Sequence, residues 1–137
     1  MRYKIIIEYD GSYYCGWQKQ DELISIQESI EIALKNTVGY DVNVFGSGRT
    51  DAGVHALNQV AHFDLKNEFS EYKIVQALNF YLREQTTNRF NDWKKIVKNF
   101  KIQNKQMFCD LVPFIKQDIS IKSCEIVPDD FDARFSA

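Results

Sequence analysis

The chain has 137 residues, enough for one domain with a substantial core but not for two large ones. Hydrophobic residues make up 45% of it and charged residues 26%, the balance of an ordinary soluble globular protein rather than of a disordered chain. No apolar run approaches the ~18 residues of a membrane-spanning helix. The formal net charge of −2 gives no support to nucleic-acid binding, because free-standing RNA-binding domains usually carry a basic balance.

The cysteines and histidines argue against a metal or disulfide framework. Cys15, Cys109 and Cys124 form no Cys-x-x-Cys pair, and His55 and His62 are the only histidines, so we expect no structural zinc site. Reduced thiols in a cytoplasmic protein are the default interpretation. The N-terminal residues lead directly into a strand-like pattern, and we expect no signal peptide.

The first part of the chain predicts a strand followed by a helix. Arg2 to Asp10 is rich in Ile and Tyr, which is typical of a buried strand. Ser25 is suited to cap a helix, with Glu28 completing a capping box and Gly39 ending it. The apolar residues between them recur at helical spacing: Ile26, Ile30, Ala33, Leu34 and Val38.

An aromatic cluster lies between that strand and that helix, after a turn at Asp10-Gly-Ser12. Tyr13, Tyr14 and Trp17 are either core residues or stacking surfaces for a nucleic-acid base. From the residues alone, core packing is the expected role of Trp17.

Apolar patterns predict the remaining elements. Three further strands are expected at Asp41 to Phe45, Ala56 to Leu65 and Ile119 to Val127. A second helix, capped by Ser70, is marked by Phe69, Tyr72, Val75, Leu78 and Leu82. Pro128-Asp-Asp130 predicts a turn, and Ala133 to Ala137 the start of a last strand.

The order strand-helix-strand-strand-helix-strand defines the fold class. It is that of an α+β, ferredoxin-like split β-α-β-β-α-β unit. Such a unit has an antiparallel sheet with both helices on one face, which leaves the other face for a nucleic acid or a second domain.

Between the second and third strands lies Gly46-Ser-Gly-Arg-Thr-Asp-Ala-Gly-Val-His55, called here the signature loop. Its glycines allow a tight loop that presents a guanidinium (Arg49), a carboxylate (Asp51) and an imidazole (His55). The spacing is that of neither a P-loop nor a dinucleotide fingerprint. Taken alone, Asp51 has the alternative of closing the turn through its own backbone, and Arg49 that of a solvated charge.

The signature loop resembles, residue for residue, the active-site loop of the tRNA pseudouridine synthase A family. Four further segments are similar to motifs of that family: Tyr9 to Gln18, Ile26-Gln27, Gln59 to Phe63 and Phe131 to Ala137. The resemblance covers the chain except one internal stretch. It implies conversion of uridine to pseudouridine in the anticodon arm of tRNA, with a homodimer as the working form.

The resemblance also implies site residues. Asp51 matches the catalytic aspartate, acting as nucleophile or base near the sugar–base junction, in a reaction that needs no metal, redox or nucleotide cofactor. Arg49 would take the place of the flipped-out base or hold a phosphate, with a structural hydrogen bond across the loop as the alternative. His55 is either an RNA contact or a partly buried, satisfied histidine. Gln18 and Arg134 lie in family motifs and are substrate-side candidates.

One internal stretch departs from the family pattern. About 30 residues, roughly Arg83 to Leu111, read as an insertion, because joining Leu82 to Val112 gives a continuous family-like segment. Arg83 to Lys105 has a net charge of +5 and the remainder −7. Four apolar residues at helical spacing predict a basic amphipathic helix: Phe90, Trp93, Val97 and Phe100. It is either a contact for RNA phosphates or a tolerated surface insertion with a solvated face.

The family also implies residues beyond Ala137. A following strand supplies a tyrosine that stacks on the uracil, and a second domain supplies basic residues beside the aspartate. We therefore interpret residues 1–137 as the N-terminal domain, without the C-terminal one, with weak activity alone. A fragment, one half of a split gene that needs a separate C-terminal half, and a decayed gene product all fit this interpretation.

Two other function classes remain open. One is a non-catalytic, ferredoxin-like RNA-binding module, whose sheet should carry the pattern Lys/Arg-Gly-Phe/Tyr-Gly/Ala-Phe-Val-x-Phe/Tyr. Asn58 to Asp64 lacks that pattern. The other is an inactive, folded remnant. Asp51→Asn separates these classes from the enzyme, because only an enzyme makes that side chain decisive.

Overall fold

The computed structural model describes residues 1–10, 16–17, 25–48, 55–99 and 117–136, with only the backbone described for 89–99 and 136. Its elements follow the order β1 (Arg2–Tyr9), α1 (Ile26–Val38), β2 (Phe45–Gly46), β3 (Ala56–Asp64), α2 (Glu71–Asn99), β4 (Ile119–Val127) and α4 (Ala133–Ser136). Within this part of the chain, no helix is long and apolar enough to cross a membrane.

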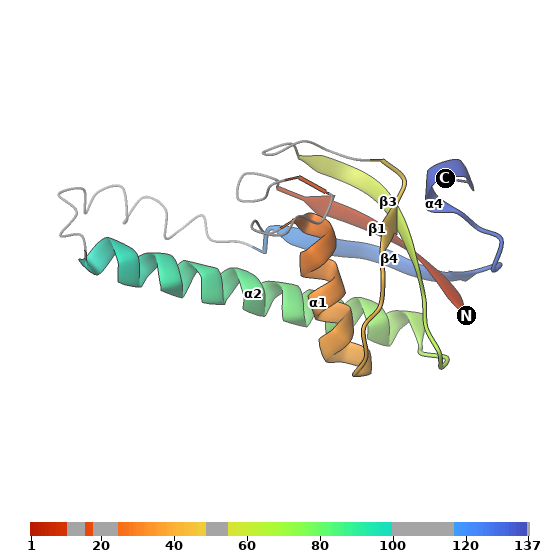
Figure 1. Ribbon diagram of the computed structural model, residues 1–137, viewed down its shortest axis with the longest axis horizontal. Coiled ribbons are helices and arrows are strands. Elements are labelled where there is room, and N and C mark those ends of the chain that lie inside the picture. Colours follow the sequence, from red (N-terminus) through yellow and green to blue (C-terminus); the bar gives the residue numbers. More distant parts are fainter. Residues whose placement is uncertain (11–15, 18–24, 49–54, 100–116, 137) are drawn as a thin grey trace.

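The four strands form one antiparallel sheet in the order β2-β3-β1-β4. Helices α1 and α2 lie on one face of it, below the sheet in Figure 1, and α4 lies on the opposite side. The predicted α+β, ferredoxin-like arrangement is confirmed. We call the sheet face opposite α1 and α2 the free face.

The central strand β1 organises the core through its two-residue alternation. Tyr3, Ile5, Ile7 and Tyr9 are buried toward the helices, whereas Arg2 and the other alternate side chains point to the free face. Tyr3 stacks on Phe63 of β3, with ring centroids 5.7 Å apart. The remaining core comes mainly from one face of each helix: Ile26, Ile30, Ala33, Leu34, Ile74, Leu78 and Leu82.

The predicted boundaries of α1 are confirmed. Ser25 Oγ accepts a hydrogen bond from the Glu28 N–H (3.1 Å). Gly39 takes a left-handed conformation (φ 88°) that a side chain would strain, and its N–H donates to Lys35 O.

The predicted strand from Asp41 to Phe45 is wrong in extent, because β2 covers only Phe45–Gly46. Side chains of α1 take the hydrogen bonds that a longer strand would need. Glu31 Oε2 accepts from the Val44 N–H (3.0 Å), and Gln27 Nε2 donates to Val44 O (2.9 Å). The segment before Phe45 is thereby tied to the helix instead of to the sheet.

Helix α2 extends beyond the part of it that packs against the domain. Ser70 caps it as predicted, through a long hydrogen bond from the Lys73 N–H (3.5 Å). Of the residues that mark this helix in the sequence, Tyr72 is exposed. The helix continues without a break from the predicted helix into the predicted insertion and ends at Asn99. Near the junction it still contacts the domain, since Gln85 donates to Ser29 O and Thr86 to Asp118 Oδ1. Residues 100–111 of the predicted insertion lie outside the described part, and the insertion itself stays a prediction.

The predicted last strand, from Ala133 to Ala137, is wrong. Residues Ala133–Ser136 form the short helix α4. Asp132 caps it, with its Oδ1 accepting from the Arg134 N–H (2.8 Å) and its backbone oxygen from the Phe135 N–H (3.1 Å). The preceding turn is as predicted, and the Phe131 N–H donates to Pro128 O (2.9 Å).

Candidate active site

The signature loop joins β2 to β3, and the structure describes both of its flanks. Asp51 and Arg49 lie among residues 49–54, outside the described part of the chain, as does Gln18. The geometry of the site is therefore built from the loop's two ends and from what holds them.

The first flank is fixed to β3 by backbone and side-chain hydrogen bonds. The Ser47 N–H donates to Val60 O (2.8 Å). Gln59 then accepts from Ser47 Oγ (3.3 Å) and donates to Gly48 O (2.6 Å). These bonds end one residue before Arg49, so they set the direction in which the loop leaves the sheet.

A buried tryptophan lies beneath the start of the loop. Trp17 is 3% exposed, as its expected core role requires, and packs beside Tyr9 with ring centroids 6.3 Å apart. Its indole approaches Gly46 so closely that a Cβ there would lie 2.6 Å from the ring. Trp17 of the first family-like motif is thus packed against the base of the signature loop. Tyr13 and Tyr14, the other members of the aromatic cluster, lie outside the described residues.

The second flank ends at His55, beside the ends of β1 and β4. His55 Nδ1 lies 3.1 Å from Asp10 Oδ1, with side chains 61% and 57% exposed. The Asp10 N–H donates to Asp118 O (2.8 Å). A hollow of about 320 Å³ opens there, lined by Glu8, Tyr9, Asp10, His55, Ala56, Leu57, Gln117, Asp118 and Ser120.

Arg134 comes from α4 on the free face. It is exposed, and its guanidinium carbon lies 5.3 Å from the centroid of the exposed Phe135 ring. Helix α4 contacts β2 and β3, the two strands that the signature loop joins. The two strands that support Arg134 are therefore the same two that the loop joins. Among the described side chains, Arg134 does not contact His55 or Gln59.

Two residues of the motif Gln59 to Phe63 emerge as important without having been singled out from the sequence. Gln59 holds the loop, and His62 holds the segment that carries Arg134, because His62 Nδ1 accepts from the Ala133 N–H (3.0 Å). His62 is one of two histidines in the sequence, and the alternation of β3 is the signal that could have placed it on the free face. Its partner could not be inferred, since the structure makes a helix where the pattern predicts a strand.

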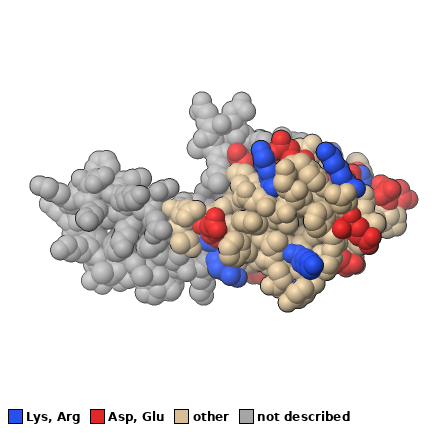
Figure 2. Space-filling model, turned by 90° about the horizontal axis from the view of Figure 1, so that it is seen from below, with Lys and Arg blue, Asp and Glu red and all other residues tan. Residues whose placement is uncertain are grey.

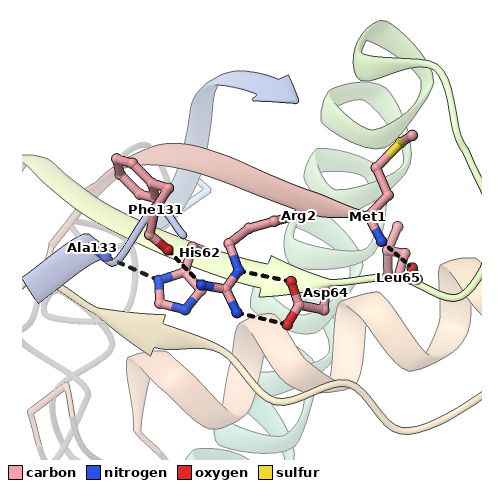
Figure 3. Close-up of polar contacts among 7 residues, drawn as sticks. All are labelled: Met1, Arg2, His62, Asp64, Leu65, Phe131 and Ala133. Atoms are coloured by element: carbon pink, nitrogen blue, oxygen red, sulfur yellow. Dashed lines mark hydrogen bonds and ion pairs between the residues drawn. The ribbon is translucent and has the colours of Figure 1, made fainter. Parts of the chain in front are cut away.

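Figure 3 shows the charges beside this contact. Arg2 makes a two-pronged pair with Asp64 (2.8 and 2.9 Å) and also donates to Phe131 O. Hydrogen bonding to Arg2 lowers the pKa of Asp64, and the same bond raises the pKa of Arg2. Burial lowers the pKa of His62, and the neighbouring Arg2 adds to that effect.

The described residues offer little other reactive chemistry. Burial raises the pKa of the Cys124 thiol to about 12, so it stays protonated and is a poor nucleophile. No three His, Cys, Asp or Glu side chains in the described ranges gather as a metal site.

The fold and the sequence of the loop together indicate a domain of the pseudouridine synthase class. Comparison with known families agrees, since the family described as tRNA pseudouridine synthase matches residues 5–101. The chain belongs to the tRNA pseudouridine synthase family.

Individual relatives carry the more specific name tRNA pseudouridine synthase A. The protein of that name from Rhodopseudomonas palustris (strain BisB18) is 44% identical over 136 residues, 99% of this chain and 42% of the relative. The protein from Wolbachia pipientis wMel is 41% identical over 138 residues, 100% of this chain and 43% of the relative. The chain thus spans less than half the length of these relatives.

Proposed function

We propose that this chain is the N-terminal domain of an enzyme that isomerises uridine to pseudouridine in the anticodon arm of tRNA. The observation that carries the proposal is the 44% identity over 136 residues to a protein named tRNA pseudouridine synthase A, a span that includes the signature loop. The two anchored flanks of that loop support it, because a catalytic group must be held in position to act.

Asp51 is the proposed catalytic residue. The reaction breaks the N1–C1′ bond of uridine and forms a C5–C1′ bond, while C5 loses a proton and N1 gains one. The atoms balance without an oxidant, reductant or metal. A carboxylate near C1′ or C5 would act as nucleophile or base.

The remaining site residues are proposed as RNA contacts. Arg49 would fill the space of the flipped base or hold a phosphate. Gln18 would lie on the substrate side, beside the Trp17 that supports the loop. His55 and Arg134 are exposed and therefore accessible to a polyanion.

The free face is the proposed side for RNA, because α1 and α2 cover the other face of the sheet. Figure 2 shows the opposite side, covered by α1 and α2, where lysine and arginine side chains are interspersed with acidic ones in the described part. A phosphate backbone gains affinity from basic groups and loses it near acidic ones. Arg134, Arg2 and Lys4 lie on the free-face side, where Arg2 pairs with Asp64 and Lys4 with Glu125 (3.4 Å), so the charges of the free face are mixed as well.

We infer that residues 1–137 need a second unit for full activity. The partner arginine of Asp51 and the stacking tyrosine would come from a C-terminal half, in the same or a separate polypeptide. The working form would be a homodimer in the cytoplasm. The stretch about 83–111 would be an insertion in the N-terminal domain.

The test is tritium release from tRNA carrying uridine labelled at C5, with this chain, with Asp51→Asn, and with each supplemented by the C-terminal half of a relative. The matched control is Asp41→Asn, another aspartate whose surface pair with Lys35 is exposed. Release lost with Asp51→Asn and kept with Asp41→Asn supports the enzyme. No release from folded protein in any arm, with RNA affinity lost in Arg49→Ala but kept in Asp51→Asn, would instead indicate a binding module.

A further inference from the structure

The last described residues cross the free face and are held there at a few points. In this C-terminal segment (residues 128–136), the Phe131 carbonyl accepts from Arg2 and the Ala133 N–H donates to His62. Figure 3 shows both contacts next to each other, from β1 and β3 respectively. Since α4 follows at once, these two bonds determine where Arg134 is presented.

His62 is enclosed by this segment. It is 5% exposed, stacked on Phe45 of β2 (centroids 5.2 Å apart) and met edge-on by Phe131 (6.2 Å). Its Nδ1 is the acceptor for the Ala133 N–H, so the proton of the neutral ring is on Nε2. A protonated imidazole is a donor at both nitrogens and would set N–H against N–H at this contact.

We propose that His62 is a pH-dependent anchor for the C-terminal segment: its neutral Nδ1 holds the segment, and with it Arg134, on the free face, and protonation releases both. His62 is thus a positioning residue. The anchoring stands independently of the proposed function; its consequence for tRNA, through Arg134, rests on that function.

Burial, reinforced by the charge of Arg2, opposes the protonation of His62. From β1, Arg2 faces the ring directly, and Lys4 lies over Phe131 with its ammonium 5.7 Å from the ring centroid. Asp64 of β3 and Asp132 of the segment favour the charged form, yet burial and Arg2 prevail and the pKa falls below 6.5. The side chains of β2 near the ring carry no charge. Between the lowered pKa of folded His62 and the ordinary value of 6.5, the folded state binds fewer protons than the unfolded state. The hydrogen bond from the Ala133 N–H to His62 is therefore intact at neutral pH and is lost as the pH falls through the lowered pKa.

The experiment is an NMR titration of the 137-residue chain. The imidazole resonances of His62 and the amide resonances of Ala133, Arg134 and Phe135 are followed from about pH 8 to about pH 4.5, a range that brackets the ordinary histidine pKa. The proposal predicts that all of them titrate together, with a midpoint below 6.5. An Ala133 amide that does not follow His62 would overturn it.

Two substitutions separate anchoring from mere packing. His62→Asn keeps an acceptor near the Nδ1 position but cannot be protonated, so the Ala133 titration should vanish while its hydrogen bond persists. His62→Phe keeps a ring and removes the acceptor, so exchange of the Ala133 amide should rise about five- to ten-fold at neutral pH, the effect of one lost hydrogen bond. A titration that persists in folded His62→Asn, or unchanged exchange in folded His62→Phe, would each contradict the anchor.

Measuring tRNA binding by the same variants connects the anchor to the proposed function. His62→Phe and Arg134→Ala should weaken binding to a similar extent, and His62→Asn should not. If none of the proteins, wild type included, binds tRNA even with the C-terminal half of a relative added, the proposed function fails, while the titration still decides the anchor. Binding that is lost in Arg134→Ala and unchanged in His62→Phe would show that Arg134 does not depend on His62.

Discussion

At the scale of single residues, the base of the signature loop depends on a glycine. Gly46→Ala would place a Cβ 2.6 Å from the buried Trp17 ring. We expect a loss of about 1–3 kcal/mol in the free energy of unfolding, as for other overpacked sites, measured by urea denaturation. Gly48→Ala is the matched control, because a Cβ there meets nothing within 4 Å. Equal effects of the two substitutions would refute the close packing of Trp17 beneath the loop.

The Arg2–Asp64 pair gives a second residue-scale prediction, on pH. Hydrogen bonding to Arg2 lowers the pKa of Asp64 below 3.8. The pair's stabilisation is therefore present above pH 3.8 and is lost as pH falls through the lowered pKa. Asp64 is 54% exposed, so the effect should stay below about 1 kcal/mol. Urea midpoints measured from neutral to acid pH should fall less in Asp64→Asn than in wild type, and parallel curves would count against the pair.

At the scale of elements, Asn79 joins α2 to the edge strand β4. Its side chain donates to Ile121 O (3.0 Å) and accepts from the Ile121 N–H (2.8 Å), next to the register shift between β1 and β4. Asn79→Ala leaves both backbone groups without these partners and should cost about 1–3 kcal/mol. Gln76→Ala, at an exposed position of the same helix, is the control. Equal midpoints of thermal unfolding for the two variants would contradict this role.

The elements that local patterns predicted well are those whose backbone hydrogen bonds lie mostly within the element or its sheet. The capped, 3.6-residue periodicity of Ile26–Val38 reappears in the structure. The extent of Ile119–Val127 is as predicted, but its alternation is interrupted after Ile121, where the register shifts and Asn79 of α2 takes the Ile121 backbone groups. The short β2 could not be foreseen, because two side chains of α1 take the backbone groups of Val44. The last strand failed because Asp132 caps a helix turn that sequence patterning did not reveal.

For the candidate site, the sequence motif identified the signature loop but not the side chains that hold its surroundings in place. The roles of Gln59 and His62 depend on contacts with Gly48 and Ala133, residues whose positions relative to the strand are set by tertiary structure. Asp51 remains a prediction from the motif, flanked by segments whose geometry is now defined.

At the scale of the whole molecule, the described residues form a four-stranded, ferredoxin-like sheet with one face covered by helices. It corresponds to about two fifths of the length of the relatives it matches. The free face, with the signature loop at its end and α4 across it, is where we expect a second unit and tRNA to meet. This expectation is what a whole-molecule experiment must test.

The most direct test is a fusion of this chain to the remaining C-terminal residues of the Rhodopseudomonas palustris relative, assayed for tritium release from tRNA labelled at C5 of uridine. We expect release that Asp51→Asn abolishes and Asp41→Asn leaves intact. Release that survives Asp51→Asn, or none from a folded fusion that binds tRNA, would contradict the claim that this domain supplies the catalytic loop.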